Sequence, residues 1–162
     1  KEKDLEKYRA QFTKEGIDAP ETENYYHFVD EFYKEIIRPT IIQPTLLYDF
    51  PAEMAPLAKR SVTDPRIAER MQLIAAGMEL NTCYTELNDP VVQRELFEQQ
   101  EQDRAAGDDE AQRIDEAYLT AMEYGMPPNA GWSLGIDRFA ALLTNSPTLR
   151  DRIAFPRLKP KE

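Results

Sequence analysis

The sequence predicts an α+β fold in which helices flank a central group of strands. Apolar residues recur at helical spacing in the first 37 residues and again near residues 109–124. Between these segments, residues 72–87 are rich in apolar and β-favouring side chains. The 162 residues, of which 41% are apolar, suffice for one core. We therefore expect a single domain or part of a larger one.

The first 40 residues predict two helices. The first helix has one apolar side and ends at Gly16. The second helix covers residues 23–37 and ends at Arg38-Pro39, because proline disfavours a helical conformation in the residue before it.

Strands are expected in the middle of the chain. Prolines divide the next segment and leave strand fragments around Ile41 and residues 45–48, followed by an irregular loop. Residues 66–87 are interrupted by Gly77 and are long enough for one bent strand or two joined strands. We expect this segment to form the centre of the sheet.

The second half of the chain contains further helices and one short strand. Aspartate, proline, serine and glycine at the ends of these segments act as capping and stop signals. The predicted elements are a helix from Pro90 to about Ala106, a helix from about Asp109 to Tyr124, a strand over residues 132–134, a helix from Ile136 and a short helix capped by Ser146-Pro147, before a basic tail.

Composition restricts the chemistry that is possible. The net charge is −10, with acids concentrated in residues 95–116, so a broad phosphate-binding surface is not expected. Cys83 and His27 are the only residues of their types, which excludes disulfides and Cys/His zinc sites. No run of about 18 apolar residues is present, and we expect a soluble, cytoplasmic protein that acts through carboxylates, arginines, backbone groups and an oxygen-liganded metal.

A first candidate group lies near the end of the predicted central strand. Strand periodicity places Thr82, Tyr84 and Glu86 on one face. A buried carboxylate requires a partner, so Glu86 could pair with a cationic ligand while Tyr84 contacts its aliphatic part. The alternative is that this face is solvated at the edge of a sheet, and the residues by themselves leave the two interpretations equally open.

A second candidate group contains Glu79 and Gln72, which are seven residues apart. Strict alternation would place them on opposite faces, unless the strand is kinked near Gly77. A carboxylate oxygen is a good ligand for Mg²⁺ and a neutral amide a weaker one. Spacing alone makes a metal site the minority interpretation.

The third candidate is Arg138, which follows Asp137 where a predicted strand passes into a helix. A guanidinium at such a junction suits phosphate oxygens, and Gly131 and Gly135 would let a flat ligand approach the backbone. The Walker pattern with its lysine is absent. From the residues alone, an intramolecular ion pair on a surface helix is the preferred interpretation of Arg138.

Four stretches, in order, resemble one family. These are TIIQPTLLYDFPAEMAPLAKR, GMELNTCYTELNDP, DDEAQRIDEAYLTAMEYGMPPNAGWSLGIDR and NSPTLRDRIAFPRLKP. They are similar to the C-terminal half of the catalytic domain of class II lysyl-tRNA synthetases, and GWSLGIDR is similar to the third class II motif. The resemblance implies an antiparallel sheet flanked by helices and an ATP- and Mg²⁺-dependent ligase that converts lysine to an adenylate and transfers it to tRNA.

The resemblance also implies residue roles. Arg138 grips the triphosphate of ATP as the catalytic residue, with Gly135 and Glu79 in the cofactor site, and Glu79 is one of two acids that hold Mg²⁺. Glu86 receives the lysine substrate beside Tyr84 and Thr82. Two positions depart from the family pattern: the second metal acid falls at Gln72, and the family asparagine falls at Thr82, one residue after Asn81, so weaker metal binding and a shifted substrate contact are expected. Cys83 replaces a small residue.

The chain has no counterpart of the first two class II motifs or of the anticodon-binding domain, and it does not begin with methionine. Residues 1–162 are therefore interpreted as the C-terminal portion of a catalytic domain, inactive alone and active in a homodimeric full-length ligase that contacts tRNA mainly elsewhere. The alternatives are a non-catalytic binding or regulatory module, and a paralogue that aminoacylates a protein.

Overall fold

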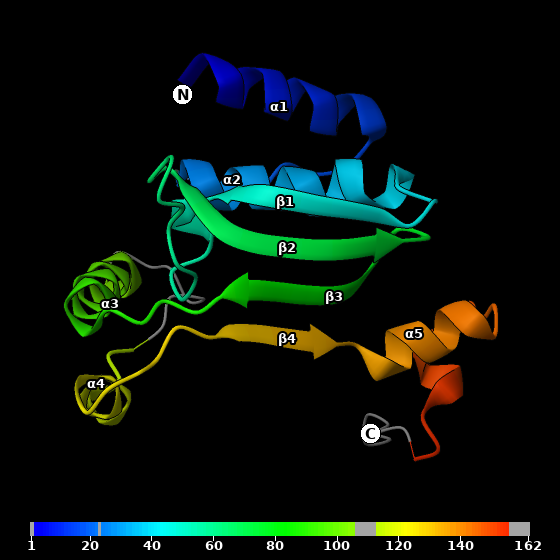
Figure 1. Cartoon of the computed structure of the whole chain (residues 1–162). Helices are drawn as coiled ribbons and strands as arrows, with labels where there is room; N and C mark the ends of the chain where they lie inside the picture. Colours follow the sequence, from blue (N-terminus) through cyan, green and yellow to red (C-terminus); the bar gives the residue numbers. More distant parts are fainter. Residues whose placement is uncertain (1, 23, 106–112, 156–162) are drawn as a thin grey trace, which may run out of the picture. The chain divides into compact units, whose positions relative to one another are not determined.

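The computed structural model describes residues 2–22, 24–105 and 113–155. Four strands form one sheet in the order β1-β2-β3-β4 (Figure 1). The elements, in chain order, are α1 (Glu2–Glu15), α2 (Tyr25–Phe32), η1 (Tyr33–Ile37), η2 (Arg38–Thr40), β1 (Thr45–Pro51), η3 (Ala52–Met54), β2 (Ile67–Ala75), β3 (Met78–Thr85), α3 (Pro90–Ala105), α4 (Glu116–Glu123), β4 (Ala130–Leu134), α5 (Ile136–Leu143) and η4 (Leu149–Arg152). The antiparallel α+β fold expected from the sequence is confirmed.

The chain divides into two compact units. The first unit comprises residues 1–47, 72–82 and 132–162, and the second comprises residues 48–71 and 83–131. The division passes through the strands, so each unit contains part of the sheet together with its own helices. The two units are described separately below.

Helices α1 and α2 of the first unit pack through aromatic rings. The Tyr8 and Phe32 ring centroids lie 4.6 Å apart, and Phe12 meets Phe28 edge-on at 5.7 Å. Phe12 and Phe28 are fully buried, and burial of such side chains contributes about 1.5–3 kcal/mol each. The Asn24 side chain accepts hydrogen bonds from the first turn of α2 and so fixes where the helix begins.

The predicted end of the second helix is wrong. The α-helical part stops at Phe32, and the chain continues through the single π-helical turn η1 and the 3-10 turn η2. Pro39 lies in the first turn of η2, where its missing N–H costs nothing. Proline therefore changes the type of helix here without ending the helical path. Residue 23, the predicted first residue, lies outside the described residues.

The central segment forms two joined strands. Ala76 and Gly77 connect β2 to β3, and both have positive φ, 50° and 72°, as a two-residue type I′ hairpin turn requires. Their N–H groups donate to the carbonyls of Ile42 and Ile41 at 2.9 Å. Ile41, predicted as part of a strand, instead anchors this turn from outside any strand.

The second unit contains the helices α3 and α4. Asp89 caps α3, and Asp115 caps α4 through the Tyr118 N–H. The two helices are joined by the Arg94–Glu116 ion pair, with two N···O distances of 2.9 Å. Helix α4 begins at Glu116, later than the predicted residue 109, because the cap that closes its first turn is Asp115. Residues 106–112 lie outside the described residues, so the predicted stop at Gly107 is not described.

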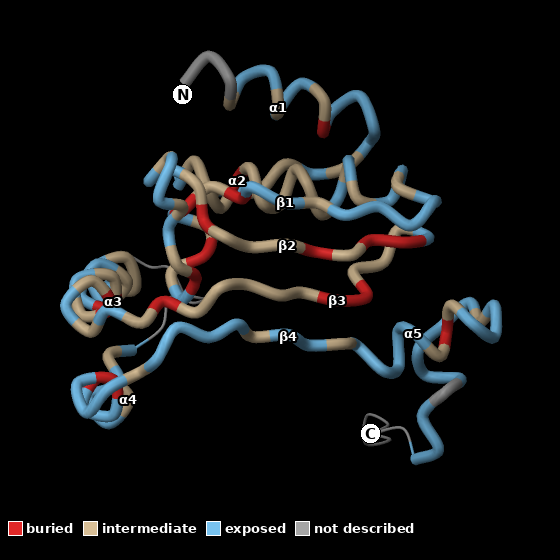
Figure 2. The backbone as a smooth tube through the Cα atoms, viewed as in Figure 1, coloured by how far each residue is buried: buried red, intermediate tan, exposed pale blue. Residues whose placement is uncertain are grey.

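The C-terminal segment returns to the first unit. Strand β4 and helix α5 appear where they were predicted, and Figure 2 shows that most of this segment is exposed. The expected cap at Ser146-Pro147 is wrong: η4 is a 3-10 helix that starts after Thr148, and no side chain caps it. The basic tail, residues 156–162, lies outside the described residues.

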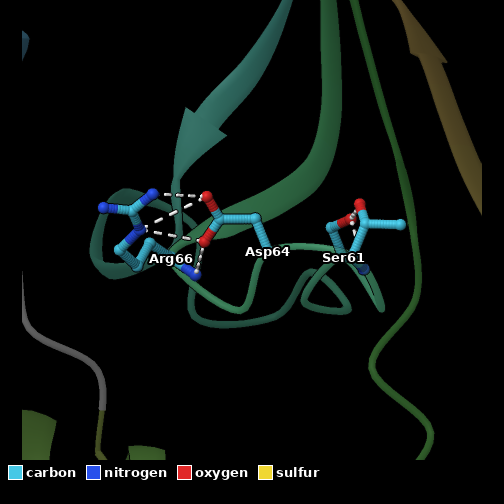
Figure 3. A network of polar contacts seen from close by, with 4 residues as sticks. Ser61, Asp64 and Arg66 are labelled. Atoms are coloured by element: carbon cyan, nitrogen blue, oxygen red, sulfur yellow. Dashed lines mark hydrogen bonds and ion pairs between the residues drawn. The ribbon is translucent and has the colours of Figure 1, made fainter.

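A polar network orders the turn that precedes β2 (Figure 3). The Arg66 guanidinium donates to both carboxylate oxygens of Asp64, with distances of 2.7–3.3 Å, and Ser61 bonds Thr63 beside it. The bonds from Arg66 lower the Asp64 pKa to about 2.

None of the helices among the described residues is long and apolar enough to cross a membrane.

Candidate functional site

Arg138 of the first unit is held against β3. Its Nη1 donates to the Glu79 carbonyl oxygen at 2.9 Å, and the neighbouring Gly135 N–H donates to Leu80 O at 2.8 Å. A Cβ at Gly135 would lie 3.3 Å from the Arg138 Cδ. A side chain at position 135 would therefore crowd the stem of Arg138, which reaches back to the strand.

The interpretation of Arg138 as part of a surface ion pair is wrong for the described residues. The ion pairs found there are those of Lys34, Arg66 and Arg94. Arg138 instead bonds a backbone carbonyl and stays exposed. A guanidinium has five N–H donors, so this single bond leaves donors that can bind the oxygens of an anion.

The hairpin places Glu79 and Gln72 on one face. The two-residue turn pairs Ala75 with Met78, so Gln72 lies opposite Asn81, and Glu79 lies opposite Ile74. Residues directly opposite in an antiparallel pair share a face. The expectation of opposite faces treated the segment as one continuous strand, and the turn at Ala76-Gly77 reverses that conclusion.

Gln72 is nevertheless withdrawn from solvent. The residue is 3% exposed, and its Oε1 accepts a hydrogen bond from the Tyr33 hydroxyl at 3.3 Å. Tyr33 opens the π-helical turn η1, and such turns occur often at functional sites. The Gln72 amide is thus part of a neutral, buried contact with the helical layer, an environment in which an unpaired carboxylate would be costly.

The β2–β3 hairpin offers Glu79 as a carboxylate ligand for magnesium. Among the described residues, no group of three or more His, Cys, Asp or Glu side chains could hold a metal ion. Glu79 remains as a half-buried carboxylate. Protein-bound Mg²⁺ commonly uses one or two carboxylates together with substrate phosphates and water. Glu79 is therefore the carboxylate on this hairpin that could serve as a protein ligand for such an ion.

Asn81 is the asparagine nearest to the position where the resemblance expects one, but its side chain is used inside the sheet. The Asn81 amide donates to Ser133 O at 2.5 Å and to Thr82 O at 3.3 Å, so it links β3 to β4 and is buried. The Thr82 Oγ1 is buried without a hydrogen-bond partner among the described residues. The polar group available at this point is therefore the threonine hydroxyl.

In the second unit, Glu86 directly follows β3. Its N–H donates to Asn129 O at 3.0 Å, and Ala58 forms an antiparallel bridge with it on the other side. Tyr84 packs against a cluster of buried alanines, Ala55, Ala58 and Ala68. Because β3 lies between β2 and β4, the alternative of a solvated sheet edge is wrong.

The Glu86 carboxylate lies against the backbone of Gly131 and is half-buried. Burial raises the pKa of Glu86, and no hydrogen bond to its carboxylate is found within the described part of the chain. A carboxylate kept from water without a cation favours binding of one. The second unit thus presents a negative group ready for an ammonium or guanidinium.

Tyr118 is a residue near Glu86 that the sequence did not single out. Burial, with the nearby Glu86 carboxylate and Tyr84, raises the pKa of Tyr118. Its ring also lies 6.2 Å from that of Phe97. Tyr118 lies at an apolar position of α4, where a tyrosine is normally interpreted as a core residue. Only the tertiary structure shows that Glu86 and Tyr84 lie near it.

Comparison with known proteins identifies a family for the chain. The family model of class II tRNA synthetases (D, K and N) matches residues 2–159. Relatives named lysine–tRNA ligase include one from Shouchella clausii, 46% identical over 154 residues, which are 95% of this chain and 31% of the relative. Another, from Oceanobacillus iheyensis, is 44% identical over 161 residues, 99% of this chain and 33% of the relative. A third, from Staphylococcus aureus strain MRSA252, is 44% identical over 156 residues, with 96% and 32% covered.

The chain spans about a third of the length of these relatives. The match to the family model nevertheless covers almost the whole chain and includes every described candidate residue. The chain therefore belongs to the class II tRNA synthetases of the D, K and N group.

Proposed function

We propose that this chain is part of a lysine–tRNA ligase and supplies residues for binding ATP and lysine. The observation that carries the proposal is Glu86, a half-buried carboxylate with a raised pKa that lacks a cationic partner among the described residues. Lysine is an amino acid with a terminal ammonium, which such a carboxylate selects. The relatives named lysine–tRNA ligase support the same substrate.

The proposed reaction has two steps. The lysine carboxylate attacks ATP, forming a lysyl-adenylate and releasing pyrophosphate, and the lysyl group then passes to tRNA. Arg138, exposed and held by one backbone bond, is the group that stabilises charge on the phosphates. Preorganised donors of this kind commonly contribute about 3 kcal/mol each. Glu86 and Tyr84 orient the lysine side chain, and the Thr82 hydroxyl is a further polar contact for substrate.

Magnesium, when bound, supplies positive charge to the triphosphate. Glu79 is the residue that would hold it, and Gly135 lets Arg138 take its position beside that residue. The tRNA, the formation of a homodimer and a cytoplasmic location are parts of the same proposal. With a net charge of −10, this chain is expected to leave most tRNA contacts to other segments.

The test is amino-acid-dependent exchange of pyrophosphate into ATP, measured with the protein as its gene encodes it. Lysine should support exchange, and the other standard amino acids should not. Glu86→Gln removes the charge with little change in shape, and we expect the KM for lysine to rise by about 10²-fold, which corresponds to about 3 kcal/mol for a charge-assisted bond. Exchange that depends equally on lysine and on a neutral amino acid would contradict the proposal.

The second candidate is a non-catalytic, lysine-binding module, and Gln72 favours it. The amide sits where the resemblance expects a metal acid, and it is buried against Tyr33. Calorimetry separates the two functions: a module binds lysine without supporting exchange. For a paralogue that modifies a protein, exchange would occur but labelled lysine would not appear on tRNA.

A further inference from the structure

A side chain at Gly131 would compete for space with the Glu86 carboxylate. A Cβ built on this glycine would overlap the Glu86 Oε1, and it would lie 3.3 Å from the Glu86 carboxyl carbon and 3.8 Å from the Tyr84 Cε2. The described glycines with positive φ are Gly16, Gly77 and Gly125. Gly131 is not among them, so its backbone conformation is open to any residue. The reason for a glycine at this position is therefore space.

The space is used by one carboxylate whose backbone cannot retreat. The Glu86 N–H bonds Asn129 O at 3.0 Å. The residues on either side are also held, because Lys59 N donates to Thr85 O at 2.8 Å and Leu87 N donates to Leu57 O at 3.0 Å. Any added side chain at position 131 must then displace the carboxylate itself rather than the strand.

We propose that Gly131 is a positioning residue that seats the Glu86 carboxylate against the β4 backbone and thereby sets where a cationic amino-acid side chain is bound. The inference rests on the proposed function only in naming lysine as that ligand. The position of the carboxylate is a feature of the second unit, to which both Gly131 and Glu86 belong. One added methyl group at position 131 should move the carboxylate out of its half-buried position.

The experiment compares Gly131→Ala with Ala130→Ser, which adds one atom at the exposed neighbouring residue of the same strand. In Gly131→Ala, the KM for lysine should rise at least tenfold while the KM for ATP changes less than twofold. Ala130→Ser should change neither. An unchanged KM for lysine in a folded Gly131→Ala protein would overturn the proposal.

Rescue by a shorter acid separates positioning from general damage. Glu86→Asp withdraws the carboxylate by one methylene, so adding Gly131→Ala to this variant should raise the KM for lysine less than threefold further. A tenfold or larger further rise would contradict the steric account, because the shorter side chain no longer needs the space. If Gly131→Ala lowers the melting temperature strongly, the double variant still gives this comparison.

A measurement without substrate distinguishes failure of this inference from failure of the proposed function. Carbon-13 NMR titration of the Glu86 carboxyl should show its pKa falling toward the ordinary glutamate range in Gly131→Ala, because the displaced group becomes exposed. An unchanged titration curve would refute the positioning role of Gly131 even if the protein proves to be a lysine ligase. A shifted curve without any lysine-dependent exchange would support the positioning role of Gly131 and reject the proposed function.

Discussion

Replacing Arg138 with alanine should remove pyrophosphate exchange while leaving the protein folded. The guanidinium makes one hydrogen bond, to the Glu79 carbonyl at 2.9 Å, and is otherwise exposed. Losing one neutral-acceptor bond of this kind costs about 1 kcal/mol of folding free energy. For a protein of this size that lowers the melting temperature by about 2–4 °C. The effect on folding is therefore small.

The effect on catalysis should be much larger. Removing one preorganised donor to transition-state charge typically lowers kcat about 10²–10³-fold, and Arg138 has several donors beyond the one bonded to Glu79. Arg138→Lys retains the charge without the planar fork and should fall between wild type and Arg138→Ala. Arg60→Ala is the matched control, because Arg60 is exposed and forms no side-chain hydrogen bond in the described structure.

The assay is lysine-dependent exchange at saturating lysine and ATP, with circular dichroism to verify folding. Arg60→Ala should retain at least half of the wild-type rate. If Arg138→Ala keeps a rate within threefold of wild type, the role assigned to Arg138 is refuted. A loss of the folded signal in Arg138→Ala would instead contradict the small folding cost derived from its single bond.

Three further predictions concern stability and pH. In the hairpin turn, Ala76→Asn should raise the free energy of unfolding by a few tenths of a kcal/mol, since type I′ turns favour Asn-Gly. Gly77→Ala should lower it by about 1–2 kcal/mol, because φ is 72° there. Urea unfolding curves decide both signs. Arg66 lowers the pKa of Asp64 to about 2. The stabilisation from this ionised carboxylate is fully present above the pKa of about 3.9 in the unfolded chain, and it is lost as the pH falls through about 2. The difference in free energy of unfolding between wild type and Asp64→Asn should therefore vanish between these two pH values, and a constant difference would show that the ion pair does not form. Burial raises the pKa of Glu86. On acidification, the KM for lysine should therefore begin to increase at a higher pH than it would with an ordinary glutamate, whose pKa is about 4.3. A pH profile of kcat/KM that is flat above about pH 4.3 would argue against Glu86 as the lysine partner.

Much of the local structure was predictable, because it depends on neighbours in sequence. Gly16 ends the first helix with φ of 71°, and Asp89 caps the helix that begins at Pro90. Such signals act through hydrogen bonds within three or four residues, so a window of sequence contains them. The helix ends that were predicted wrongly, at Pro39 and Ser146, lie where the chain passes from one helix type to another or where no side chain caps the turn.

The candidate residues themselves came from the sequence, through strand periodicity and the resemblance to a family. Their surroundings did not. The partner of Arg138 is a carbonyl 59 residues away in sequence, and that of Gln72 is a tyrosine 39 residues away. Such contacts depend on how strands pair and on which helix covers them, and no short stretch of sequence indicates either.

The sequence by itself therefore determined the fold class, the family and the identity of the candidate residues, because helical and strand periods, caps and motifs are local properties of the chain. Only the tertiary structure decided that Ala76-Gly77 is a hairpin turn, which puts Glu79 and Gln72 on one face. It also showed that the Glu86 carboxylate fills the space where a side chain on Gly131 would begin. The physical reason is excluded volume: which atom fills the space beside a glycine is set by a residue 45 positions away, and no window of sequence contains both.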